Sequence, residues 1–161
     1  MNELRIGLGV DAHAFEDGVP LVLGGVEVES PRGLAGHSDG DVLAHALVDA
    51  LLGAAGLGDI GSLFPPGEPE WAGASSLGLL ARAAAEVRTA GWELVSADCV
   101  LIGEEPRIGP RREQMRARLA EAVGVEPERV NVRATTTDKL GFTGRGEGLA
   151  AQAVALVRPA G

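Results

Sequence analysis

Alternation of strand-like and helix-like segments is the feature that most constrains the fold of this 161-residue chain. No repeat, low-complexity tract or linker interrupts the alternation. The expected strands are 4–11, 92–102 and 129–134, with a hairpin at 20–28 built around two glycines. The expected helices are 38–55, 74–89 and 110–123. This order predicts one α/β or α+β domain with a mixed sheet.

Three boundaries depend on local chemistry. Ser38 is the expected cap of the first helix, and Gly56 is its expected end. The stretch 58–69 is rich in Gly and Pro and is expected to be a loop. Residues 149–157 fit either state, because their alanines allow a helix while their length and final Leu-Val suit a strand. Periodicity alone does not choose between the two.

Charge and composition exclude several classes of function. The net charge is −9, so no basic field is available to hold nucleic acid. No apolar stretch is long enough to span a bilayer, and the N-terminus lacks the pattern of a secretory signal. The single cysteine, Cys99, cannot form an internal disulfide and is expected to be inert core. These features predict a cytoplasmic protein without nucleic acid or membrane partners.

The three histidines of the chain lie within its first 45 residues, close to aspartates. Asp11 and His13 end the first strand, where residues two apart point to the same face. Together with His45 on the first helix they make a plausible three-ligand zinc site with an open fourth position. Asp49, one helical turn from His45, is expected to orient its ring. The alternative is a strand-capping histidine, a core histidine and solvated aspartates, and the combined spacing favours metal.

A second cluster runs from 134 to 148. Thr135, Thr136 and Thr137 offer hydroxyl and N–H groups to phosphate oxygens, and Asp138 can hold a hard cation. Four following glycines allow close backbone approach to a ligand. The alternative is an ordinary Gly-rich turn with capping threonines, and local grounds leave both open. The segments 58–65 and 103–110 could bind substrate and a base, but connecting loops need no function.

Four motifs, at 5–13, 36–46, 49–61 and 134–148, resemble the 2-C-methyl-D-erythritol 2,4-cyclodiphosphate synthase family. The match runs in order over essentially the whole chain. The resemblance implies an α+β fold of the α/β sandwich type, with a mixed four-stranded sheet backed by helices. It also implies a homotrimer with active sites between subunits, and it makes the last segment a strand.

Residue roles follow from the same resemblance. Asp11, His13 and His45 correspond to zinc ligands, and Asp138 to the ligand of a second divalent ion, magnesium or manganese. His37 and Thr136 correspond to groups that stabilise the transition state. The methylerythritol phosphate part is expected at 59–61 and 64–68, and the cytidine diphosphate part at 103–109 and 135–138. The implied substrate-binding residues are Asp11, Ala12, His13, His37, Ser38, Asp59, Ile60, Gly61, Phe64, Pro65, Pro66, Gly67, Glu68, Gly103, Glu104, Glu105, Pro106, Arg107, Ile108, Gly109, Thr135, Thr136, Thr137, Asp138, Phe142 and Arg145.

The implied reaction converts 4-diphosphocytidyl-2-C-methyl-D-erythritol 2-phosphate into 2-C-methyl-D-erythritol 2,4-cyclodiphosphate and CMP. A mononuclear zinc phosphoesterase is the alternative, and a non-catalytic trimer that stores zinc or senses isoprenoid diphosphates is a third reading. The chain departs from the family pattern at three positions. Asp138 stands where glutamate is usual, Pro66 where aspartate is common, and Val10 where an aromatic residue often lies near the trimer's central channel.

Overall fold

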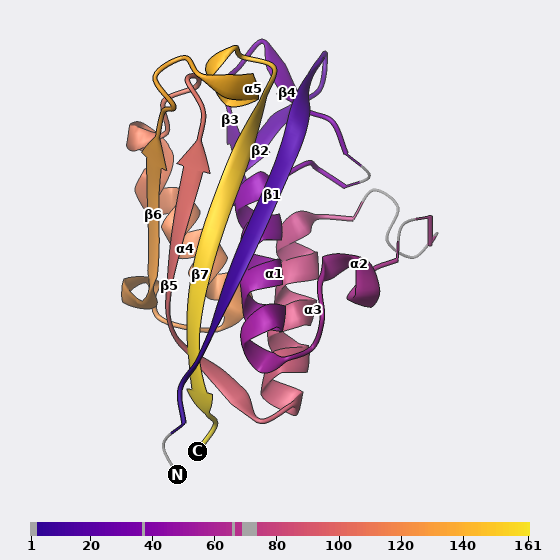
Figure 1. Cartoon of the computed structure of the whole chain (residues 1–161), viewed down its shortest axis with the longest axis vertical. Coiled ribbons are helices and arrows are strands. Elements are labelled where there is room, and N and C mark those ends of the chain that lie inside the picture. The colour runs from indigo at the N-terminus through magenta and orange to yellow at the C-terminus, as the bar shows by residue number, and fades with distance from the viewer. Residues whose placement is uncertain (1–2, 37, 66, 69–73) are drawn as a thin grey trace.

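The computed structural model describes residues 3–36, 38–65, 67–68 and 74–161. Its main feature is a mixed five-stranded sheet in the order β4-β1-β7-β5-β6 (Figure 1). The strands are β1 (Arg5–Asp17), β4 (Arg32–Leu34), β5 (Trp92–Ile102), β6 (Val130–Thr135) and β7 (Gly148–Pro159). β5 and β6 are parallel, and the other neighbours are antiparallel. The expected hairpin is present as β2 (Leu21–Leu23) paired with β3 (Val26–Val28).

The expectation of four strands is wrong because β1 is longer than the sequence pattern indicates. It runs for 13 residues, past the predicted end at residue 11. Its pairing with β7 ends at Ala14, opposite Gly148. The protruding end, Phe15 to Asp17, pairs instead with β4, which becomes a fifth, short strand at the edge.

The ambiguous segment 149–157 lies inside a strand. β7 is central and pairs with β1 on one side and β5 on the other. Ala151, Ala153 and Ala155 alternate with more exposed residues and are buried. Small side chains at these positions fit beneath the covering helices, which explains why a strand here is so rich in alanine.

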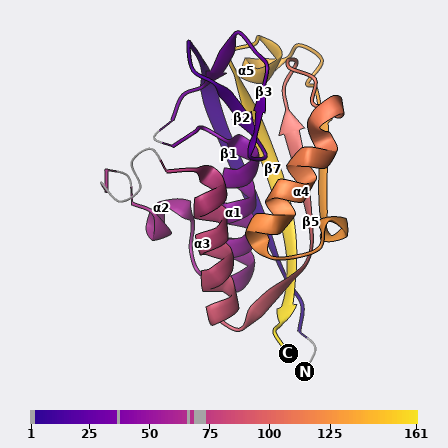
Figure 2. The same cartoon turned by 180° about the vertical axis from the view of Figure 1, so that it is seen from behind.

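Helices cover one face of the sheet (Figure 2). The long helices are α1 (Val42–Ala55), α3 (Ser76–Thr89) and α4 (Arg112–Val123). Short helical segments are α2 (Ile60–Leu63), α5 (Gly141–Gly144), and the 3-10 turns η2 (Gly109–Arg111) and η3 (Pro127–Arg129). α2 interrupts the stretch 58–69, so the expectation of a plain loop there is wrong over four residues. None of the helices in the described ranges has the length and apolar character needed to cross a bilayer.

The cap of α1 is Asp41 and not Ser38. The Asp41 carboxylate accepts hydrogen bonds from the N–H groups of Ala44 at 3.1 Å, Gly24 at 2.9 Å and Gly25 at 2.7 Å. It is fully buried, and burial raises its pKa to about 6 against the effect of these three donors. One aspartate therefore begins α1 and ties the β2–β3 hairpin to it. The expected end at Gly56 is confirmed, with φ 72°.

The opposite face of β1 carries a row of exposed apolar side chains. Ile6, Leu8 and Val10 are 72, 62 and 55% exposed, and Val154 on the neighbouring β7 is 45% exposed. The three β1 residues alternate with Gly7 and Gly9, which are buried under α1. We call the four exposed residues the open apolar face.

Candidate active site

The structure brings together the three residues expected to hold zinc. His13 Nε2 lies 2.8 Å from Asp11 Oδ2, His45 Nδ1 lies 3.1 Å from the same oxygen, and the two histidine nitrogens are 3.4 Å apart. β1 supplies the first two residues on one face, and α1 places His45 above them. A tetrahedral zinc ion needs ligand atoms about 3.3 Å apart, given bonds of about 2.0–2.1 Å. Small outward movements of Asp11 and His13 would therefore suffice to fit such an ion.

The electrostatics of this group favour a cation. Burial raises the pKa of Asp11, but hydrogen bonds and charges from His13 and His45 outweigh it and lower that pKa to about 2. The hydrogen bond with Asp11 raises the pKa of His13 above 6.5, against the effect of burial. Asp11 thus keeps its negative charge in a partly buried position, where an ion can balance it.

The predicted partner of His45 is wrong. Asp49 Oδ1 accepts a hydrogen bond from Ile60 N at 2.7 Å and so holds the start of α2. His45 Nε2 instead lies 2.8 Å from Ser76 Oγ and 3.1 Å from Ser38 Oγ. Helical spacing placed Asp49 one turn away but could not show which way its carboxylate turns. Ser76 opens a helix 31 residues later, so no local sequence signal could have pointed to it.

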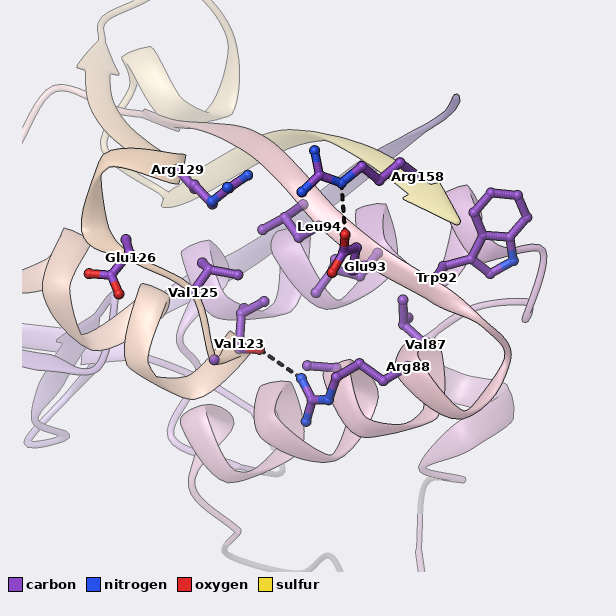
Figure 3. Close-up of a pocket in the computed structure, with 13 residues that line it drawn as sticks. Val87, Arg88, Trp92, Glu93, Leu94, Val123, Val125, Glu126, Arg129 and Arg158 are labelled. Carbon is purple, nitrogen blue, oxygen red and sulfur yellow. Dashed lines mark hydrogen bonds and ion pairs between the residues drawn. The ribbon is translucent and has the colours of Figure 1, made fainter. Parts of the chain in front are cut away.

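A pocket of about 270 Å³ elsewhere contains none of the predicted site residues. It lies between the ends of α3 and α4 and the start of β5 (Figure 3). All three of its arginines already have partners: Arg158 pairs with Glu93 at 2.7 Å, Arg88 donates to the Val123 carbonyl at 2.8 Å, and Arg129 donates to the Val95 carbonyl at 3.0 Å. It is therefore not part of the candidate active site.

The second predicted cluster forms at the ends of two parallel strands. β5 and β6 pair up to Ile102 and Thr135, so the segments that follow them lie together. They enclose a pocket of about 460 Å³. Of the predicted residues, those lining it are Gly103, Glu104, Pro106, Arg107, Ile108, Gly109, Thr135 and Thr136. Arg112 and Arg133 also line it, and the sequence analysis missed both.

Some predicted residues lie around this pocket rather than in it. Glu105 lines a separate hollow together with Arg145, whose Nε lies 2.5 Å from Glu147 Oε2. Phe142, in α5, is 42% exposed. Ala12 lies on the face of β1 opposite Asp11 and His13, so only its main chain could contact a substrate bound on the side of those two residues.

The turn at 137–139 has an unusual backbone that Glu104 supports. Asp138 and Lys139 have φ values of 53° and 67°, in the left-handed region. The Glu104 carboxylate accepts the N–H groups of Thr137 at 3.4 Å and Lys139 at 3.2 Å. Asp138 is exposed, and its Oδ1 accepts from Thr136 Oγ1 at 3.4 Å. Within the described ranges, the only group of three or more His, Cys, Asp or Glu side chains close enough to share a metal ion is Asp11, His13 and His45, so Asp138 belongs to no such group.

The remaining predictions concern 59–68 and His37. Asp59 caps α2 by accepting from Ser62 N at 2.8 Å, which leaves Ile60 and Gly61 in the helix. Phe64 is 7% exposed and packs in the core. Pro65, Gly67 and Glu68 are exposed. His37 and Pro66 lie outside the described residues.

Fold and site together define an α+β protein with a carboxylate–dihistidine group that could hold a metal ion, and with a separate pocket where two parallel strands end. The model of the YgbB family matches residues 4–158. The chain therefore belongs to the YgbB family.

Relatives and solved structures agree with that membership. The chain is 58% identical over 163 residues to the 2-C-methyl-D-erythritol 2,4-cyclodiphosphate synthase of Rubrobacter xylanophilus, covering 99% of this chain and 98% of that protein. It is 56% identical over 154 residues to the enzyme of the same name from Symbiobacterium thermophilum, covering 96 and 98%. A CDP-bound structure of a synthase with this name has a TM-score of 0.87 at 40% identity, covering 95 and 99%. The bifunctional IspDF of Campylobacter jejuni has a TM-score of 0.95 at 42% identity, covering 99% of this chain and 43% of that one.

Proposed function

We propose that the chain is a lyase of the non-mevalonate isoprenoid pathway. It converts 4-diphosphocytidyl-2-C-methyl-D-erythritol 2-phosphate into 2-C-methyl-D-erythritol 2,4-cyclodiphosphate and CMP. Identity of 56–58% to synthases of that name, over nearly the full chain, supports the activity. The observation that carries the chemistry is the convergence of Asp11, His13 and His45 within 3.4 Å of one another.

The pocket at the ends of β5 and β6 is the proposed place of the cytidine diphosphate part. Its size of about 460 Å³ suits a ligand of this kind. Arg107 and Arg112 supply positive charge to an otherwise acidic protein, whereas Arg133 is already paired with Asp98 at 3.0 Å. A related synthase has been solved with CDP bound, which supports a cytidine diphosphate ligand for this chain. The methylerythritol phosphate part is then proposed to bind at residues 59–61 and 64–68.

The proposed reaction is an attack of the 2-phosphate on the β-phosphorus of the same molecule, with CMP as leaving group. The nucleophile needs no base, because a phosphate monoester has its second pKa near ~6 and is already anionic. The protein must therefore align two anionic groups and balance their charge. Zinc, when bound by Asp11, His13 and His45, would polarise the diphosphate. Thr136, and His37 by resemblance, would donate hydrogen bonds to the oxygens that gain charge.

A second ion, magnesium or manganese, is proposed at Asp138. The residue is exposed, so retained water molecules could complete the coordination, as magnesium commonly requires. Substrate phosphate oxygens would supply the other ligands. Glu104 supports this role indirectly, since it holds the turn that presents Asp138.

The active form is proposed to be a homotrimer in the cytoplasm, with sites between subunits. The open apolar face supports association, because monomers rarely expose contiguous apolar patches of this kind. Burying Ile6, Leu8 and Val10 against a second copy would remove them from water. A neighbouring subunit could then add residues beside the metal site.

The test is incubation with the cytidyl substrate, zinc and magnesium, followed by phosphorus NMR. The cyclic diphosphate signal and equimolar CMP are expected. Repeating the reaction in ¹⁸O-labelled water distinguishes the synthase from the phosphoesterase: label in the product would establish a phosphoesterase and exclude cyclisation. Substrate binding without CMP release would instead establish a non-catalytic protein.

A further inference from the structure

The two histidines of the metal group differ in what holds the ring nitrogen that faces away from it. His13 bonds to the backbone of Ala35 through that side of its ring. His45 Nε2 lies 2.8 Å from Ser76 Oγ. Ser76 is fully buried, and its hydroxyl is also bonded to Asp39 Oδ1. Asp39 Oδ2 accepts a hydrogen bond from Ser76 N at 3.0 Å, so this carboxylate is hydrogen-bonded to both the N–H and the hydroxyl of the serine.

Hydrogen-bond chemistry fixes the direction of this chain of contacts. An ionised carboxylate can only accept, so the single hydroxyl proton of Ser76 goes to Asp39. The Ser76 oxygen then has only lone pairs left for His45, and Nε2 must carry a proton to donate to it. His45 Nδ1 is consequently left with its lone pair, facing Asp11 and His13.

Without this arrangement the His45 ring would favour the other tautomer, with its proton on Nδ1. Asp11 Oδ2 lies 3.1 Å from His45 Nδ1, and a carboxylate at that distance attracts a proton onto Nδ1. A proton there would occupy the atom that must bind metal. Ser38 Oγ, 3.1 Å from Nε2, is a more distant partner and has no carboxylate bonded to its hydroxyl among the described contacts.

We propose that Ser76, oriented by Asp39, is a positioning residue that fixes the metal-binding tautomer of His45. The inference rests on the zinc site proposed above and goes beyond its ligands, since it places a residue of α3 in control of a ligand on α1. Groups that hold the outer nitrogen of a metal-bound histidine change metal affinity by roughly 10- to 100-fold.

The first measurement is the tautomer of His45 in the metal-free protein, read from imidazole ¹⁵N shifts at a pH where the ring is neutral. The parent should show the Nε2–H form, and Ser76→Ala should shift to the Nδ1–H form. An unchanged tautomer in folded Ser76→Ala would overturn the inference, as would an Nδ1–H form in the parent.

The second measurement is zinc affinity by competition with a chelating dye. Ser76→Ala should bind zinc roughly 10- to 100-fold more weakly. Ser75→Ala is the matched control: Ser75 caps α3 by accepting from Gly78 N at 3.3 Å, so its loss weakens the helix but leaves His45 untouched. Equal losses of affinity in the two variants would assign the effect to the helix and refute the role of Ser76. A larger loss in Ser38→Ala than in Ser76→Ala would also refute it.

A double-mutant cycle tests the part played by Asp39 and guards against a Ser76 variant that folds poorly. Asp39→Asn alone should weaken zinc binding, because an amide can donate to Ser76 Oγ and free its proton to point at His45. The double variant should lose no more than Ser76→Ala alone, since Asp39 acts through Ser76. Parent-like affinity in Asp39→Asn, or fully additive losses, would contradict this. Failure of the parent to bind zinc would instead refute the metal site itself.

Discussion

A β-carbon placed on Gly9 would stand 1.9 Å from the carbonyl oxygen of Ala46. That separation is far inside van der Waals contact, so β1 and α1 touch backbone to backbone at this point. His45 precedes Ala46 on the helix, and Asp11 follows Gly9 by two residues on the strand. The close approach therefore sets the distance across which zinc would be held.

Gly9→Ala should separate β1 from α1 and weaken zinc binding together with stability. We expect a loss of about 1–3 kcal/mol in the free energy of unfolding, as for other overpacked sites. Chemical denaturation and zinc titration would measure the two effects. Gly53→Ala is the control, since the nearest atom to its β-carbon would be 3.9 Å away. Zinc affinity in Gly9→Ala equal to that of the control would show that the contact does not govern the site.

Asp11→Asn should lower the pKa of His13. The hydrogen bond that the Asp11 carboxylate accepts from the His13 ring is the largest cause of the raised pKa, and the charge of Asp11 adds to it. In the metal-free protein the His13 pKa should therefore fall. NMR titration of the ring protons would follow the change. An unshifted pKa would mean that another group holds the proton on His13.

Acid should weaken the metal-free protein through the same carboxylate. The folded-state pKa of Asp11 is lowered from 3.8 to about 2, so its contribution to stability is present above 3.8 and is lost as pH falls towards 2. Asp11→Asn should lack that contribution at pH 5 and change less with pH across this window. Thermal unfolding of both proteins between pH 5 and pH 2 gives the comparison. Parallel curves would count against an ionised Asp11 in the folded state.

Asp138→Asn should raise the magnesium concentration needed for turnover while leaving zinc content unchanged. Aspartate is shorter than the usual glutamate by roughly 1–1.5 Å, so a bridging water or a small shift of the turn is expected. Asp138→Glu should retain activity or bind magnesium more tightly. The measurement is initial rate against magnesium concentration. If Asp138→Asn follows the parent curve, the second ion is held elsewhere.

Leu8→Glu should prevent trimer formation. A carboxylate on the open apolar face would have to be buried without a partner on association, at a cost of several kcal/mol. Light scattering at micromolar concentration should then report a monomer. Leu57→Glu makes the same chemical change at a residue that is 39% exposed, just after α1 on the helical side. A trimer in Leu8→Glu would show that this face is not the interface.

Regular patterns in the sequence predicted the fold well where local chemistry decides it. The β2–β3 hairpin, the three long helices and the Asp11–His13 pair on one strand face were all expected and are present. The errors lie where a distant partner decides. Ser38 and Asp41 are both good caps, but only a carboxylate can also accept the two hairpin N–H groups of Gly24 and Gly25.

The candidate site shows the same division. The grouping of Asp11, His13 and His45 could be predicted, because strand and helix periods are properties of short segments. The contacts of Asp49 and of His45 Nε2 could not be predicted. Asp49 accepts a hydrogen bond from Ile60 N, and Ser76, 31 residues after His45 in the sequence, contacts His45 Nε2. Both contacts depend on tertiary packing, which the spacing of residues along the chain does not predict. Cytoplasmic location and the second ion stay predictions.

The beginning of β1 lies beside the end of β7 (Figure 1). Arg5 is opposite Val157, and its guanidinium lies 4.7 Å from the centre of the Trp92 ring. The loops that follow β5 and β6 lie at the other end of the sheet. A polypeptide segment joined to the start of β1 or to the end of β7 would therefore lie away from these loops and would not have to cross them.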